Sequence, residues 1–215
     1  MSFLTMLETM SSGMLKTCAI FFLTILFSLP LGFLVSFGRM SKNPILRNIV
    51  KVYISIMRGT PLMLQLLVWY FGPFYLFKIP IRGYRFTAII LGFAFNYAAY
   101  FGEIFRAGIE SMPQGQYEAA KVLGYTKTQT FFRIILPQVI KRILPAVTNE
   151  VITLVKDTSL AFSLAYQEVF SIAKQISTSQ TSFMPFLIAG VFYYIMNYAV
   201  AFAMERIEKS MSYYR

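Results

Sequence analysis

The chain has 215 residues, of which 57% are hydrophobic and only 13% are charged, about half the charged share of a soluble domain. A soluble fold cannot cover that much apolar surface, so we expect lipid to surround most of the chain. This composition excludes a soluble enzyme, a disordered chain and a nucleic-acid-binding domain. The net charge of +11 then indicates basic loops on the cytoplasmic side of a membrane.

Histidine is absent, and Cys18 is the one cysteine. The sequence therefore excludes histidine metal sites, histidine proton relays and an intramolecular disulfide. We expect no metal site. The first ten residues contain Glu8 and no basic residue, so they do not predict a cleaved signal peptide.

Runs without charged residues predict the membrane spans, because about 20 apolar residues are needed to cross a hydrocarbon core of about 30 Å. The uncharged runs cover residues 17–38, 59–77, 86–102 and 183–204. Extended by their apolar flanks, they predict spans at roughly 15–38, 52–77, 86–109 and 183–206.

A further span is expected at 139–166, although this segment is less apolar. It carries Glu150, Lys156 and Asp157, and Pro145 lies near its start. Each charge inside a span costs at least about 2.5 kcal/mol on insertion scales. We therefore expect this span to face protein or water rather than lipid.

The basic residues predict the orientation of the chain. With the N-terminus outside and the C-terminus in the cytoplasm, thirteen Lys and Arg side chains fall on the cytoplasmic side and five on the outer side. Arg58 and Lys156 lie within spans. The opposite orientation reverses this balance, so we expect the N-terminus outside.

The loop 111–137 connects the third and fourth spans and contains two short helical patterns. The first starts after Pro113, runs to Leu123 and is expected to stop at Gly124. The second, residues 128–136, is expected to end at Pro137. Two short helices meeting at a glycine form either a knob that docks in a partner's groove or a well-capped connector.

Residues of this loop resemble the EAA signature of permease subunits of ATP-binding cassette (ABC) importers. The matching positions, all at the family's spacing, are Glu118, Ala119, Ala120, Gly124, Ile134, Leu136 and Pro137. The segments 58–62 (RGTPL), 100–108 and 156–160 (KDTSL) are similar to the polar amino-acid uptake branch, the histidine/glutamine/arginine permease type. The resemblance covers essentially the whole chain, 1–215, as one transmembrane permease domain.

The resemblance implies an all-α integral membrane protein with about five transmembrane helices and a cytoplasmic coupling loop, the type I importer permease fold. It implies a second permease subunit (identical or paralogous), two cytoplasmic ATPase subunits, an external substrate-binding protein and a bacterial cytoplasmic membrane. At the ATPase contact it places the loop residues Glu118, Ala119, Ala120, Lys121 and Gly124. No phosphate-binding loop motif occurs in the sequence, so ATP and Mg²⁺ are expected on the partner ATPase and no cofactor on this chain.

Ionisable residues within the spans are candidates for substrate binding. Asn96, Tyr100 and Glu103 share one helical face at spacings of four and three residues, and Glu150, Thr153 and Asp157 share one at three and four. We expect these two stripes to face each other or a shared watery cavity, unless the charges simply pair within the protein. Glu103 and Asp157 are the candidate partners for the ammonium of an amino acid.

A break in the chain at 58–61 is the candidate site for the substrate carboxylate. Thr60 is expected to cap and Pro61 to start a helix whose free N–H groups, together with Arg58, bind an anion. Alternatively, Arg58 extends to the cytoplasmic interface. Glu103 and Asp157 can share one site only if the fourth span begins near Gln138; otherwise Glu103 pairs with Arg106.

Two functions follow from these residues. The first is the permease subunit of an ATP-driven importer of polar amino acids, with basic amino acids as a candidate class, since two carboxylates attract a cation. The second is an amino-acid carrier or channel driven by an ion gradient. A membrane scaffold without transport activity is a third reading, which the costly intramembrane carboxylates disfavour.

Overall fold

The computed structural model describes residues 2–80 and 82–211, and every regular element within these ranges is helical. The elements are α1 (Phe3–Arg39), α2 (Pro44–Gly59), α3 (Leu62–Phe77), α4 (Arg85–Glu110), α5 (Gln114–Val122), α6 (Lys127–Gln129), a π-helical segment (Thr130–Ile135), α7 (Leu136–Asp157), a 3₁₀ helix (Thr158–Leu164), α8 (Val169–Gln180) and α9 (Met184–Ser210). The all-α class is therefore confirmed for the described residues.

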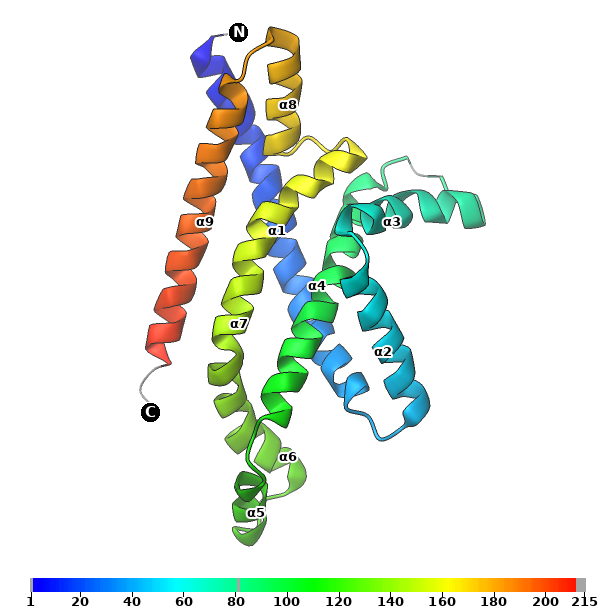
Figure 1. Cartoon of the computed structure of the whole chain (residues 1–215), viewed down its shortest axis with the longest axis vertical. Helices are drawn as coiled ribbons and strands as arrows, with labels where there is room; N and C mark the ends of the chain where they lie inside the picture. The colour runs from blue at the N-terminus through cyan, green and yellow to red at the C-terminus, as the bar shows by residue number, and fades with distance from the viewer. Residues whose placement is uncertain (1, 81, 212–215) are drawn as a thin grey trace.

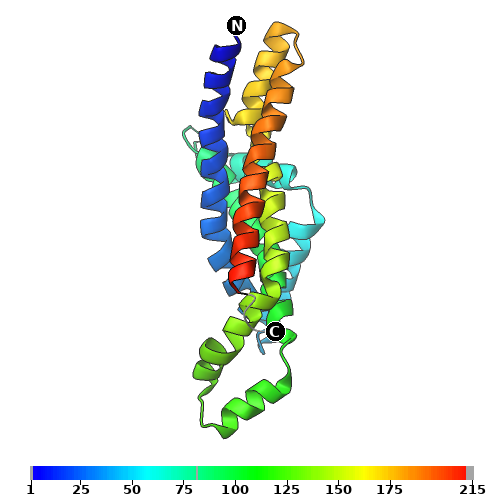
Figure 2. The ribbon, with the colours of Figure 1, turned by 90° about the vertical axis from the view of Figure 1, so that its left-hand side faces the viewer.

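The long helices α1, α4, α7 and α9 run along the length of the molecule (Figure 1). The start of α1 and all of α8 lie at one end, which we call the outer end. Residues 114–135, comprising α5, α6 and the π-helical segment, project beyond the bundle at the other end, as Figure 2 shows. We call this projection the elbow, and its side of the molecule the elbow end.

Helix α4 forms the centre of the bundle, and its buried side chains include Phe93, Tyr97 and Phe101. It packs most extensively against α1, and also contacts α2, α3 and α7. The α1–α4 contact is close because both helices have glycines there. A Cβ on Gly32 would lie 2.7 Å from the Phe101 Cβ and 3.2 Å from the Gly102 nitrogen. The two backbones can approach this closely only because these side chains are absent.

Replacing Gly32 by alanine is expected to destabilise the bundle by about 1–3 kcal/mol, because the neighbouring Cβ and backbone atoms cannot move aside. The melting temperature of the purified protein should fall by several degrees. Gly190→Ala in α9 is the matched control, since no heavy atom lies within 4 Å of the added Cβ. Equal melting temperatures for the two variants would contradict the prediction.

The predicted spans differ from the helices in two places. Within the described residues, α1, α4 and α9 are each long and apolar enough to cross a membrane, as expected from 15–38, 86–109 and 183–206. The predicted span 52–77 is instead the pair α2 and α3, bent by 112°, which together qualify as one more span. Helix α7 is not among these helices, so the span predicted at 139–166 stays a prediction.

The second arm of the elbow does not end at Pro137, which corrects the sequence prediction. From Lys127 the chain continues through the π-helical segment into α7 without a break. Pro137 lies in the first turn of α7. Proline lacks an N–H donor, so one helical hydrogen bond is missing at Pro137. The π-helical segment just before it is the kind of local bulge with which an α-helix accommodates a change in its hydrogen-bond pattern.

Candidate functional site

The break between α2 and α3 is organised by two buried amides. The Asn96 Nδ2 atom donates to the Met57 carbonyl oxygen at 3.0 Å and to the Gln65 Oε1 atom at 2.9 Å. The Gln65 Nε2 atom in turn donates to the Thr60 Oγ1 atom at 2.8 Å and to the Thr60 carbonyl oxygen at 3.1 Å. Both amides are more than nine-tenths buried. They therefore fix the sharp bend by satisfying backbone groups that the two helices leave unpaired.

Thr60 does not cap α3, contrary to expectation. Its hydroxyl donates to the Ile56 carbonyl oxygen at 2.8 Å and accepts from Gln65, and Pro61 occupies the position before the first residue of α3. The predicted helix break itself is confirmed, because α2 ends at Gly59 and α3 begins at Leu62. Gln65 was missed, since a single glutamine in an apolar run gives no periodic pattern.

A second set of contacts lies where α2, α4 and α7 come together. The Tyr97 hydroxyl donates to the Asp157 Oδ2 atom at 2.8 Å. The Arg58 guanidinium lies over the Tyr100 ring, with its Cζ atom 5.2 Å from the ring centroid. The Glu150 carboxylate, seven residues before Asp157 on α7, interacts electrostatically with both Arg58 and Asp157. A cation, two carboxylates and two phenol rings are thus concentrated in one region, and we take this region as the candidate site.

Glu103, one turn beyond Tyr100 on α4, forms ion pairs of its own. It forms an ion pair with Arg106 at 2.7 Å and a longer one with Arg39 at 3.7 Å, and Arg106 also pairs with Glu110. This is the internal pairing that the sequence left open. It holds the elbow end of α1 against α4. Helix α7 begins at Leu136, as a site shared with Asp157 requires, but Glu103 is occupied by these ion pairs.

The two polar stripes meet only in part, because Tyr100 of the first and Glu150 and Asp157 of the second belong to the candidate site. Asn96 contacts the α2–α3 break, Tyr100 stacks under Arg58, and Glu103 pairs towards α1. Thr153 is exposed, and its hydroxyl donates to the Asn149 carbonyl oxygen of its own helix. The residue of α4 that hydrogen-bonds to Asp157 of α7 is Tyr97, which lies about 100° around the helix from Asn96. Tyr97 could not be predicted from sequence spacing, because its contact with Asp157 depends on how α4 and α7 pack.

The elbow presents its motif residues on opposite sides. Glu118, Ala119 and Lys121 are exposed, whereas Ala120 is only 1% exposed. Gly124 has a φ of +78°, and the Tyr125 N–H donates to the Ala120 carbonyl oxygen at 3.0 Å, closing the turn after α5. The predicted stop at Gly124 is confirmed. Ala120 faces the inside of the elbow, so only the other motif residues can touch a partner directly.

Glu168 is a fully buried carboxylate at the outer end that the sequence analysis missed. It caps α8 by accepting from the Phe170 and Ser171 N–H groups at 2.7 and 2.6 Å, and the Tyr193 hydroxyl donates to it at 2.8 Å. Burial raises the pKa of the Glu168 carboxyl, and these three hydrogen bonds oppose the rise. It fastens α8 to α9. A glutamate before an apolar run is a weak cap signal in sequence, since shorter side chains are preferred.

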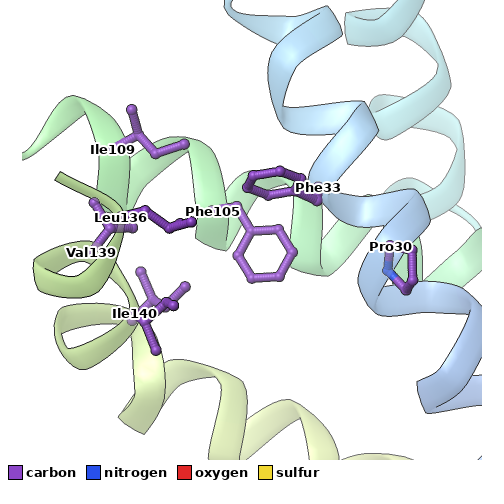
Figure 3. Close-up of a pocket in the computed structure, with 8 residues that line it drawn as sticks. Pro30, Phe33, Phe105, Ile109, Leu136, Val139 and Ile140 are labelled. Atoms are coloured by element: carbon purple, nitrogen blue, oxygen red, sulfur yellow. The ribbon is translucent and has the colours of Figure 1, made fainter. Parts of the chain in front are cut away.

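Two hollows lie outside the candidate site. An apolar groove of about 330 Å³ lies between α1, α4 and α7, with the Phe33 and Phe105 rings towards its middle (Figure 3). A more polar hollow of about 610 Å³ at the outer end is lined by Lys16, Arg82 and Arg85 among others. Neither of these two hollows includes Arg58, Glu103 or Asp157.

A bundle of apolar helices with a broken span, buried charges and a projecting elbow defines a membrane transport subunit. Residues 9–213 match the family described as binding-protein-dependent transport system inner membrane component. The chain belongs to this family and is a permease subunit of an ABC importer, a multi-pass protein of the inner membrane, which confirms the resemblance. Permeases of this family work with an ATPase and a substrate-binding protein.

Known proteins of the same family resemble the chain over most of its length. It is 36% identical over 200 residues to a permease protein of Rickettsia typhi named for a glutamine transport system, covering 93% of this chain and 91% of that one. It is 34% identical over 208 residues to the L-cystine transport system permease protein of Bacillus subtilis, covering 95% and 87%.

Solved structures support the same fold. The crystal structure of an amino acid ABC transporter with histidines contains a chain with a TM-score of 0.85 and 31% identity, covering 98% of this chain and 99% of that chain. An inward-facing methionine ABC transporter gives a TM-score of 0.78 at 21% identity, covering 99% and 100%. The predicted type I permease fold is confirmed.

Proposed function

We propose that this permease carries polar amino acids and that the region around Arg58, Tyr97, Tyr100, Glu150 and Asp157 binds them. A zwitterionic amino acid needs an acceptor for its ammonium and a donor for its carboxylate. Asp157, oriented by the Tyr97 hydroxyl at 2.8 Å, supplies the acceptor. Arg58, which lies over Tyr100, supplies the donor. The single observation that carries the proposal is that the Asp157–Tyr97 and Arg58–Tyr100 contacts are neighbours beside a broken helix, with the two tyrosine ring centroids 6.2 Å apart.

The relatives named for glutamine and L-cystine transport support a polar amino acid as the substrate. Glu103 is the weaker of the two acid candidates, because two arginines already neutralise it. Asn96 and Thr60 hold the break in shape, and Thr153 remains a candidate on the exposed face of α7.

The elbow is proposed to dock in a cytoplasmic ATPase, which binds ATP and Mg²⁺. Glu118, Ala119 and Lys121 form its contact surface, while Ala120 and Gly124 maintain its shape. The elbow end is then cytoplasmic. In Figure 1, α1 starts at the outer end and α9 runs from the outer end towards the elbow end, which agrees with an outer N-terminus and a cytoplasmic C-terminus. A second permease, identical or paralogous, completes the pathway, and an external binding protein delivers the substrate.

The test is amino-acid-stimulated ATP hydrolysis by the complete transporter in proteoliposomes. We expect hydrolysis to rise when binding protein loaded with a polar amino acid is added, and the substrate to accumulate only with ATP. The chain without its ATPase should not transport. Uptake by the ATPase-free chain under a sodium or proton gradient would overturn the proposal and support the ion-gradient carrier instead.

A further inference from the structure

Helix α2 has three distinct faces, which sequence periodicity and exposure together define. At 100° per residue they are separated by more than a quarter turn. The face packed on α1 and α4 consists of Val50, Tyr53, Ile54 and Met57; the exposed apolar face consists of Ile45, Ile49, Val52 and Ile56; and the exposed polar face consists of Arg47, Lys51, Ser55 and Arg58. We call this last face the α2 polar stripe.

The α2 polar stripe needs water. Among the described residues, no carboxylate forms an ion pair with Arg47 or Lys51. Arg58 lies eleven residues beyond Arg47, about 16 Å further along the helix, so the stripe cannot end at one membrane interface. Charged side chains inside a span face protein or a water-filled cavity rather than lipid. The apolar face on the other side of α2 meets the lipid or a neighbouring helix.

The stripe connects the elbow end with the candidate site. Helix α2 starts beside the elbow end of α1 and rises to the break before α3 (Figure 1). At its upper end, the Arg58 Cζ atom lies 5.2 Å from the Tyr100 ring centroid, and the guanidinium interacts electrostatically with the Glu150 carboxylate. The same cation therefore ends the stripe and belongs to the site.

We propose that the α2 polar stripe lines a water-filled vestibule between the candidate site and the elbow end, and that its cations attract the carboxylate of the departing amino acid. This inference rests on the proposed function. A passage lined by one sign of charge concentrates the opposite charge within it. Such a vestibule favours amino acids without a net positive charge over lysine or arginine. The substrate class is then polar amino acids that are neutral or acidic, and not basic ones.

Thiol labelling of the complete transporter tests the vestibule without any need for transport. In a Cys18→Ala background, Ser55→Cys and its neighbour Ile56→Cys are compared in nanodiscs of zwitterionic lipid. An anionic and a cationic methanethiosulfonate reagent are each applied. We expect the anionic reagent to label Ser55→Cys roughly tenfold faster than the cationic one. This preference should largely disappear when Arg47→Gln and Lys51→Gln are added.

Ile56→Cys is the matched control, since it lies at the same depth on the apolar face and should react at least about tenfold more slowly with both reagents. Equal labelling of the two positions, no labelling of Ser55→Cys, or a charge preference that survives the glutamine substitutions would each overturn the inference.

In transport, the double glutamine variant should raise uptake of lysine relative to glutamine, and an unchanged ratio would overturn the assigned substrate class. Labelling as expected in a complex without amino-acid-stimulated ATP hydrolysis would overturn the proposed function but leave the vestibule in place.

Discussion

Replacing Ala120 by leucine is expected to abolish ATP-driven import while the membrane helices stay folded. Ala120 is 1% exposed on α5, which packs against the π-helical segment, so three added carbon atoms must separate the two arms of the elbow. Overpacking of this kind costs about 1–3 kcal/mol, which disfavours the docking shape of the elbow by a factor of about 5 to 140. Import into proteoliposomes and stimulated ATP hydrolysis should both fall at least about fivefold.

The control for this variant is Ala203→Leu, which adds the same atoms on the exposed side of α9. It should transport normally. The melting temperature of the purified Ala120→Leu permease should stay close to that of the unchanged protein, because the elbow projects beyond the bundle (Figure 2). Undiminished import by Ala120→Leu would show that the elbow does not transmit work from an ATPase.

Replacing Asp157 by asparagine is expected to weaken amino-acid binding about tenfold or more. The side chain keeps its size and its contact with the Tyr97 hydroxyl at 2.8 Å, but loses the charge that binds an ammonium group. A hydrogen bond to a charged group contributes about 1.5–3 kcal/mol. The measurement is the substrate concentration giving half-maximal stimulated ATP hydrolysis, together with uptake of labelled glutamine.

Tyr97→Phe should give a smaller loss in the same direction, because Asp157 keeps its charge and loses only its orientation. Glu103→Gln should leave the half-maximal concentration unchanged, since Glu103 is neutralised by Arg106 and Arg39. Glu205→Gln, on an exposed turn of α9, controls for the removal of one carboxylate. Unaltered binding by Asp157→Asn would remove this residue from the site.

The long helices could be predicted from sequence because lipid imposes one strong rule on them. Uncharged runs located α1, α4 and α9, although α1 begins at Phe3 rather than near residue 15. Hydropathy is insensitive to direction, however, so it joined α2 and α3 into one span, and the break predicted at 58–61 came without a bend angle. The 112° bend depends on Asn96 and Gln65 meeting across three helices, and no local pattern encodes that contact.

The candidate site was predictable in composition and less so in pairing. Arg58 and Asp157 were identified because charges are rare inside spans. Tyr100 and Tyr97 lie three residues apart on α4, and Tyr100 contacts Arg58 whereas Tyr97 contacts Asp157. The rotation of α4 within the bundle decides which tyrosine meets which charge. Glu103 pairs with Arg106 on its own helix, which was the alternative predicted from the sequence, whereas its second partner Arg39 lies sixty-four residues earlier in the chain and has no spacing that predicts it.

Helix α7 links the elbow to the candidate site, because it begins at Leu136, directly after the π-helical segment, and ends at Asp157. Its 22 residues span about 33 Å at 1.5 Å per residue. A tilt of only about 5° at its foot would displace Asp157 by about 3 Å over that length. Hydrogen-bond distances vary by only about 0.5 Å, so a small rotation of α7 is sufficient to separate Asp157 from Tyr97 and release whatever the pair holds.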